Sequence, residues 1–266
     1  MNMNWLHSLY RIPLLIILVV ISLLALIVCN PIGHRTRIGQ RSLAEHAMQP
    51  WAKVACLLFG LKPKLIGEVK SGPLLIVANH QSWQDVIVLM SLFSLRFVAK
   101  AEIRSWPVLG FLVMAADTVF LRRGDAKSSH AVSNDMAQAF KKNLRVLIFP
   151  EAGVTLTPAV GRFYGRLFAV AIDNNIPIQP IAIRYLEGGT LSQRSRFKPG
   201  EGFLVSFFRL LFGGMSDVEV HALSVIAEPT GSQRRELAET CEQQIRQTYD
   251  PNNQLDHEKA KRQRPV

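Results

Sequence analysis

A histidine and an aspartate five positions apart, His80 and Asp85, have the types and spacing in this chain that best suit chemistry. They follow Leu74–Asn79, an apolar run typical of a buried strand, and precede an apolar stretch typical of a helix. Ligands bind at the carboxyl ends of strands in an open parallel sheet. If a helix begins only after His80, with Ser82 as its N-cap, Asp85 can hold one imidazole nitrogen and leave the other as a general base.

The same residues also have a purely structural interpretation. Ser82 and Asp85 match a capping box, in which Asp85 satisfies amides at a helix start and His80 is an ordinary loop residue. The chain has no phosphate-binding loop, no glycine-rich dinucleotide motif, no G-x-S-x-G elbow and no H-E-x-x-H zinc motif. Its other histidines lack metal-ligand spacing, and its three cysteines are too scattered for a zinc site. We therefore expect no metal.

The elements that must position this pair alternate between short apolar runs and helical patterns. The apolar runs have the length and composition of strands and lie at Leu74–Asn79, Arg96–Lys100, Thr118–Arg123, Arg145–Pro150 and Ile176–Tyr185. Helical patterns are clearest over residues 125–143 and 166–174, and a further strand and helix follow over residues 217–226 and 232–249. This alternation predicts an α/β fold with a mostly parallel central sheet flanked by helices.

An apolar segment near the N-terminus is long enough to cross a membrane. Residues 12–29 carry no charge, and as a helix they would extend roughly 27 Å. A cleaved signal peptide would have a shorter apolar region and small residues at the cut, whereas this segment ends in bulky ones. One arginine precedes the segment and three follow closely, which places the body of the protein in the cytoplasm. The prediction is a single-pass anchor in the inner (cytoplasmic) membrane.

The 266-residue chain is strongly basic, with 31 lysines and arginines against 20 acidic residues and a net charge of +11. This balance indicates an anionic partner, but no nucleic-acid-binding module accompanies it, so a membrane partner is expected and nucleic acid is not. The predicted organisation is a membrane anchor over residues 1–33, a helical membrane-proximal segment over 34–62, an α/β domain over 63–250 and a basic polar tail over 251–266.

Several short blocks resemble, in order, the motifs of the PlsC-like lysophospholipid (1-acylglycerol-3-phosphate) acyltransferases. The first motif of that family is similar to Asn79-His80-x4-Asp85, and a K-x-E stretch is similar to Lys100–Glu102. The later motifs are similar to Val119–Arg123, Phe149–Glu151 and Ile176–Pro180. The resemblance covers about residues 63–230, and it favours the catalytic interpretation of His80 and Asp85 over the structural one.

The resemblance implies an O-acyltransferase that moves a fatty acyl group from acyl-CoA or acyl carrier protein to the free hydroxyl of a lysolipid. The first candidate acceptor is 1-acylglycerol-3-phosphate, which would give phosphatidic acid. His80 would be the general base and Asp85 would orient it. The substrate-binding residues implied by the motifs are Lys100, Arg123, Glu151, Gly153 and Thr155. No cofactor is implied besides the acyl donor, which is a co-substrate.

The third motif departs from the family pattern. The family usually has Gly-Thr after the glutamate, whereas this chain has Ala152, Gly153, Val154 and Thr155 after Glu151. Another lysolipid acceptor, such as a lyso-ornithine lipid, therefore stays open. Two alternatives of other classes stay open as well. One is a hydrolase in which water replaces the lysolipid, and the other is a non-catalytic, anchored lipid-binding protein.

Overall fold

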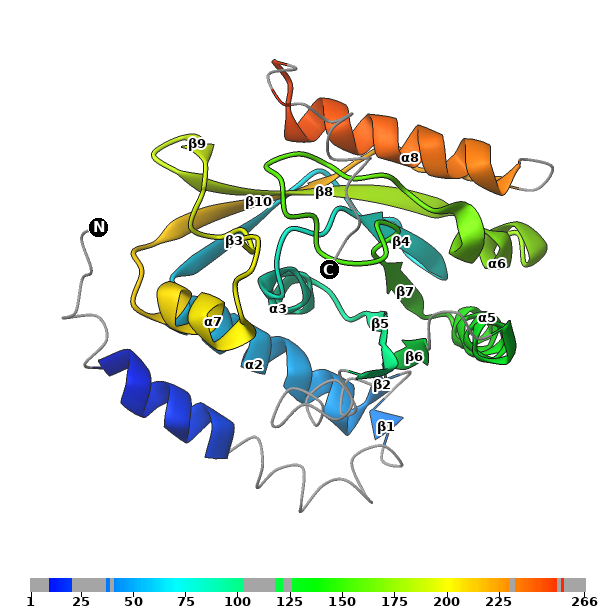
Figure 1. Ribbon diagram of the computed structural model, residues 1–266. Helices are drawn as coiled ribbons and strands as arrows, with labels where there is room; N and C mark the ends of the chain where they lie inside the picture. The colour runs from blue at the N-terminus through cyan, green and yellow to red at the C-terminus, as the bar shows by residue number, and fades with distance from the viewer. Residues whose placement is uncertain are drawn as a thin grey trace.

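The fold is a mixed eight-stranded sheet with helices on both faces (Figure 1). The computed structural model describes residues 10–20, 37–38, 41–102, 118–121, 126–229, 233–252 and 255. The sheet has the order β3-β10-β8-β4-β7-β5-β6, and β9 pairs with β8 at its end. Its strands are β3 (Leu61–Ile66), β4 (Leu74–Ala78), β5 (Arg96–Lys100), β6 (Val119–Leu121), β7 (Arg145–Ile148), β8 (Ile178–Glu187), β9 (Thr190–Leu191) and β10 (Ser216–Ala222).

Most strand pairs are parallel, as the sequence predicted. The run from β8 through β4, β7 and β5 to β6 is parallel throughout, and β3 is parallel to β10. The exceptions are the antiparallel pairs of β8 with β10 and with β9. A separate antiparallel pair joins β1 (Arg37–Ile38) to β2 (Arg41–Ser42). The α/β fold class with a mostly parallel sheet is therefore confirmed.

The helices form two layers that enclose two apolar cores. The helices are α2 (Leu43–Leu58), α3 (Gln84–Leu92), α5 (Ala126–Lys141), the 3-10 turn η2 (Gly165–Leu167), α6 (Phe168–Asp173), α7 (Phe203–Leu211) and α8 (Arg234–Tyr249). The central strand β4 is buried on both faces. Its residues alternate between the cores: Leu74, Ile76 and Ala78 face α2, α3 and α7, while Leu75 and Val77 face α5, α6 and α8.

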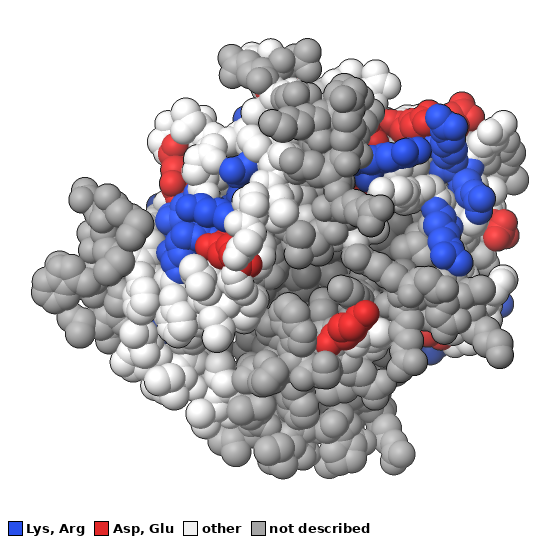
Figure 2. All heavy atoms as spheres, in the orientation of Figure 1, with Lys and Arg blue, Asp and Glu red and all other residues white. Residues whose placement is uncertain are grey.

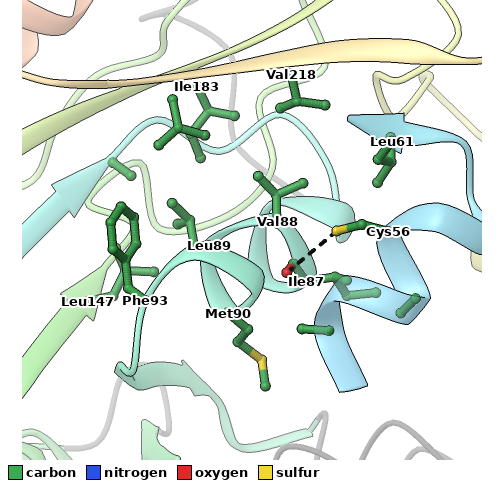
Figure 3. Packing of buried hydrophobic residues seen from close by; sticks show 14 of the residues in the cluster. Cys56, Leu61, Ile87, Val88, Leu89, Met90, Phe93, Leu147, Ile183 and Val218 are labelled. Carbon is green, nitrogen blue, oxygen red and sulfur yellow. Dashed lines mark hydrogen bonds between the residues drawn. The ribbon is translucent and has the colours of Figure 1, made fainter. Parts of the chain in front are cut away.

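The helix that follows the candidate histidine, α3, lies inside the core between the sheet and α2. Figure 3 shows α3 between the sheet and α2, with Ile87, Val88 and Leu89 among buried neighbours from both. The Cys56 thiol of α2 contacts the Ile87 carbonyl at 3.9 Å. Apolar residues surround α3 on nearly all sides, which explains why its sequence is apolar rather than amphipathic. A helix packed in this way gives its first turn a fixed position.

The N-terminal region is helical over residues 10–20. Arg11 in this helix is buried, and its guanidinium donates hydrogen bonds to the carbonyls of Leu211 and Gly213, at 3.1 and 2.7 Å. Residues 21–29, the second half of the predicted span over residues 12–29, lie outside the described residues. Among the residues that are described, no helix combines the length and apolar character needed to cross a membrane. The predicted transmembrane helix is therefore not confirmed.

Candidate active site

His80 and Asp85 meet in the turn between β4 and α3. The His80 Nδ1 atom lies 2.8 Å from Asp85 Oδ2, and the aspartate is fully buried while the histidine side chain is 15% exposed. A carboxylate facing Nδ1 favours the tautomer in which Nδ1 carries the ring proton and Nε2 can accept one. The His80 ring is stacked on Phe149, with ring centroids 4.0 Å apart and an angle of 13° between the planes. The histidine is thus held in one orientation with its free nitrogen available.

Asp85 also holds the backbone of the turn. Its Oδ2 atom accepts the amides of Gln81 and Ser82, at 2.8 and 2.9 Å, in addition to the imidazole. The two sequence interpretations are therefore compatible, since one carboxylate binds helix-start amides and orients the histidine. The predicted role of Ser82 as N-cap is wrong. Trp83 is the N-cap of α3. The Ser82 hydroxyl instead accepts a hydrogen bond from Nε2 of the Gln84 side chain at 3.0 Å.

Glu151 lies behind this turn, at the end of β7, and is 1% exposed. Its Oε1 atom accepts the backbone N–H of His80 at 2.7 Å. Its Oε2 atom accepts the backbone N–H of Gly161 at 2.9 Å and a hydrogen bond from the Thr155 hydroxyl. A Cβ atom at position 161 would lie 2.6 Å from Oε2, so this close approach requires glycine. Both carboxyl oxygens are occupied by groups of the protein itself, so Glu151 acts on the site through the backbone of His80.

Burial dominates the ionisation of Glu151. It raises the pKa of this carboxyl from 4.5 to about 8, against the opposing effect of the two backbone N–H groups, and the charge of Asp85 adds to the rise. Glu151 therefore holds a proton in the folded protein at pH values where the unfolded chain has released it.

Thr155 completes the contact between the third-motif loop and the turn that carries His80 and Asp85. Its backbone N–H donates to the His80 carbonyl at 2.9 Å. Because Glu151 binds the His80 N–H, the loop holds both backbone polar groups of the histidine. Gly153 lies in the same loop and is partly exposed. The structure thus gathers Glu151 and Thr155 around His80.

The left-handed residue of the third-motif loop is Ala152, with φ of 62°, and not Gly153. The family motif has glycine at the position of Ala152, directly after the glutamate. The loop therefore keeps the backbone shape that suits glycine, while this chain supplies alanine there. An L-residue in this region costs roughly 1–2 kcal/mol.

Lys100 and Arg123 are the two residues predicted to bind an anion. Lys100 is the last residue of β5, where only its backbone is described, and it is paired with Leu121 of β6. Arg123 lies two positions after β6, outside the described residues. Their roles in binding a headgroup or a donor phosphate stay predictions.

Sequence reasoning missed two polar side chains that join this turn to β8. The Asn79 amide exchanges two hydrogen bonds with the Ile183 backbone, at 3.0 and 2.8 Å, and extends the β4–β8 pairing by one residue. The Tyr185 hydroxyl donates to Asp85 Oδ1 at 2.6 Å. The only sequence signal for Tyr185 is a polar aromatic residue near the end of an apolar strand, close to where ligands bind in such sheets.

Comparisons with known proteins agree with this geometry. A protein-family model described as Acyltransferase matches residues 62–184. A lyso-ornithine lipid O-acyltransferase of Pseudomonas aeruginosa is 34% identical over 204 residues, which are 77% of this chain and 78% of that protein. A 1-acyl-sn-glycerol-3-phosphate acyltransferase of Neisseria gonorrhoeae is 28% identical over 173 residues, which are 65% of this chain and 68% of that protein.

The crystal structure of the 1-acyl-sn-glycerophosphate acyltransferase PlsC from Thermotoga maritima has a similar fold. The TM-score is 0.67 and the match covers 95% of this chain and 97% of that chain, at 18% identity. Fold, histidine–aspartate turn and relatives together define an enzyme that transfers acyl groups. The chain belongs to the acyltransferase family, which confirms the resemblance seen in its motifs.

Replacing Ala152 by glycine tests the strain in the third-motif loop. We expect Ala152→Gly to raise the free energy of unfolding by up to about 1 kcal/mol, because glycine adopts positive φ without a steric cost. Thermal unfolding of the purified protein in detergent measures this change in the free energy of unfolding. Ala47→Gly is the control: Ala47 is exposed within α2, where glycine should cost about 1 kcal/mol. Equal destabilisation by both substitutions would contradict the assignment.

The raised pKa of Glu151 predicts how stability depends on pH. The folded protein binds a proton at this site between pH 4.5 and about 8, so the contribution of Glu151 to the free energy of unfolding falls as pH rises through that range. Relative to the wild type, Glu151→Gln should therefore become more stable as pH rises from 5 to 8. Unfolding measured across this range checks it, with exposed Glu239→Gln as control. Parallel curves for wild type and Glu151→Gln would refute the prediction.

Proposed function

We propose that the protein is a membrane-bound O-acyltransferase that moves a fatty acyl group from an acyl thioester to the free hydroxyl of a lysolipid. The observation that carries this proposal is the His80–Asp85 contact, with Nδ1 bound at 2.8 Å and the ring partly exposed. Such a pair provides a general base at neutral pH. The acyl donor is acyl-CoA or acyl carrier protein, and no further cofactor is needed.

In the proposed reaction, His80 Nε2 removes the proton of the lysolipid hydroxyl while the oxygen attacks the thioester carbonyl. Collapse of the tetrahedral intermediate forms the ester bond and breaks the carbon–sulfur bond. The imidazolium, stabilised by Asp85, then gives its proton to the departing thiolate. The histidine ends the cycle neutral, and no group of the protein is acylated.

The described cysteines support direct transfer. Cys56 and Cys241 are both buried, and burial raises the pKa of their thiols to about 11 and about 12. A thiol in this state is a poor nucleophile at neutral pH because it holds little thiolate. Neither residue is therefore suited to carry an acyl group between donor and acceptor.

Lyso-ornithine lipid is the first acceptor we propose. Relatives named lyso-ornithine lipid O-acyltransferase, from Pseudomonas aeruginosa and Rhizobium meliloti, align over 77% and 74% of this chain. The departure at Ala152 and Gly153 supports an acceptor other than a simple phosphomonoester. 1-Acylglycerol-3-phosphate is the second candidate, supported by the relative from Neisseria gonorrhoeae, which aligns over 65% of the chain.

Basic side chains near the site suit the anionic donor. Figure 2 shows lysines and arginines in two groups on the drawn face, one near β9 and α7 and one near α6 and the start of α8. Arg162 and Arg166 are exposed and follow Gly161, the residue whose amide binds Glu151. Guanidinium groups bind phosphate through charge-assisted hydrogen bonds. We assign to these arginines the positive charge that the third motif lacks.

Membrane attachment is supported by apolar side chains exposed on neighbouring helices. They belong to residues 10–20, α2 and α7, and include Ile16, Leu57, Leu204, Val205 and Phe208. The bonds from Arg11 to Leu211 and Gly213 join the first helix to the end of α7, and Phe59 contacts Phe207 beside α2. Exposed apolar surfaces of this kind mark interaction sites, and a bilayer holds the proposed acceptor. Together with the predicted anchor, this surface supports our proposal that the enzyme lies on the cytoplasmic face of the inner membrane.

Acyl transfer by the purified protein tests the proposed function. We expect labelled acyl-CoA or acyl carrier protein to acylate lyso-ornithine lipid faster than 1-acylglycerol-3-phosphate. Removing the base with His80→Ala should lower the rate by ~10²–10⁴-fold. His130→Ala is the matched control, because His130 is exposed on α5 and should leave the rate unchanged.

Three other outcomes of the same assay would argue against the proposal. Release of free fatty acid without a diacyl product would indicate a hydrolase. Equal product from the wild type and His80→Ala would show that the histidine is not the base. No product with any donor and acceptor would favour a non-catalytic lipid-binding protein.

A further inference from the structure

Tyr185 is a buried residue bound to the candidate catalytic pair, and none of the motif blocks includes it. Its side chain is on β8, it is 3% exposed, and its hydroxyl donates to Asp85 Oδ1 at 2.6 Å. The other oxygen of Asp85 binds the His80 ring and two backbone amides. His80 contacts Oδ2 of Asp85, and among the described residues Tyr185 is the donor to the other oxygen, Oδ1.

The sheet fixes the position of the phenol. Along β8, Ile181, Ile183 and Tyr185 alternate onto the face that α3 covers. Asn79 binds the Ile183 backbone, two positions before the tyrosine, and so holds the end of β4 against β8. The Tyr185 carbonyl accepts the Ser192 amide at 2.8 Å. Backbone contacts on both sides therefore aim the hydroxyl at Asp85.

The phenol stays a donor at any working pH. Burial and the charge of Asp85 raise the pKa of Tyr185 well above 10, so its proton remains in place. A hydrogen bond from a neutral donor to a carboxylate draws negative charge toward the bonded oxygen. Less charge is then available on the oxygen that faces the imidazole.

We propose that Tyr185 is a positioning residue that sets, through Asp85, how strongly His80 attracts a proton. The proposal rests on the proposed function, in which His80 is the general base. With the phenol in place, Asp85 holds the imidazolium less tightly, so His80 is neutral and able to act as a base at a lower pH. Without it, the full carboxylate charge faces the ring and the histidine stays protonated to a higher pH.

Other ionisable groups act electrostatically on Glu151, Tyr185 and Tyr249, the buried residues near the pair, and must be considered with it. They come from α2, the loop after β7, β8, the loop before α7, and α8, and they are Cys56, Glu151, Arg184, Arg196, Glu242 and Tyr249. Tyr249 offers a matched comparison. It is a second buried tyrosine, and its hydroxyl donates to Gln81 Oε1 at 3.3 Å, one residue from His80 and away from the carboxylate.

The experiment follows the titration of the His80 ring by NMR in histidine-labelled full-length protein in detergent, and needs no substrate. We expect Tyr185→Phe to move the titration midpoint up by about half a pH unit or more, a shift produced by one lost hydrogen bond to a charged partner. Tyr249→Phe should leave it in place. An unmoved midpoint in Tyr185→Phe, or equal movement in both variants, would overturn the proposal.

A second substitution keeps the test decisive if Tyr185→Phe does not fold. Incorporating 3-fluorotyrosine at position 185 retains the hydroxyl and makes it a stronger donor, so the midpoint should move down. An upward move, or none, would count against the proposal. The acidic limb of the kcat/KM profile should shift with the midpoint. Because the NMR titration is independent of acyl transfer, failure of this proposal is distinguishable from failure of the proposed function.

Discussion

The buried carboxylate of Asp85 is the group on which the site depends. A carboxylate removed from water is costly unless donors satisfy its oxygens. Here the donors come from His80, from two amides of the same turn and from Tyr185 on another strand. Losing any one of them would leave a buried charge less well compensated. The need to satisfy one carboxylate therefore fixes the turn, the imidazole and the end of β8 together.

The surrounding fold supplies this arrangement through backbone contacts. Glu151 and Thr155 bind the N–H and the carbonyl of His80, while Asn79 ties the end of β4 to β8. Because β4 lies between β8 and β7, residues of β8 and of the loop after β7 both reach its carboxyl end. The turn that carries His80 is held by neighbours on both sides, which suits the proposed base, a group that must keep one orientation.

Local sequence patterns were sufficient for much of the architecture. Strand β4 ends at Ala78, one residue before the predicted limit, and α5 spans Ala126–Lys141 within the predicted 125–143. The contact of His80 with Asp85 was also predictable, because both residues belong to one strand–turn–helix unit. The helical capping was not: Ser82 was expected at the N-cap, whereas Trp83 is the N-cap and the Ser82 hydroxyl accepts a hydrogen bond from the Gln84 side chain.

Contacts between segments far apart in the chain could not be predicted from local sequence patterns. Tyr185 is 100 positions from Asp85, and the two meet only because β8 lies next to β4, an order that no local pattern specifies. Likewise, the glycine of the third motif is displaced by one position, whereas the backbone keeps its left-handed residue at Ala152. Glu151 accepts the backbone N–H of His80 and the Thr155 N–H donates to the His80 carbonyl, so the loop is constrained on both sides of Ala152. This explains why its shape does not follow the glycine.

The position of the proton on the His80 ring is the most direct test of the role assigned to Asp85. ¹⁵N NMR of histidine-labelled protein distinguishes a protonated from an unprotonated ring nitrogen, and the signals missing from His80→Ala identify the residue. We expect the neutral ring to carry its proton on Nδ1, with Nε2 unprotonated, and Asp85→Asn to abolish this preference. A wild-type ring with its proton on Nε2 would contradict the account.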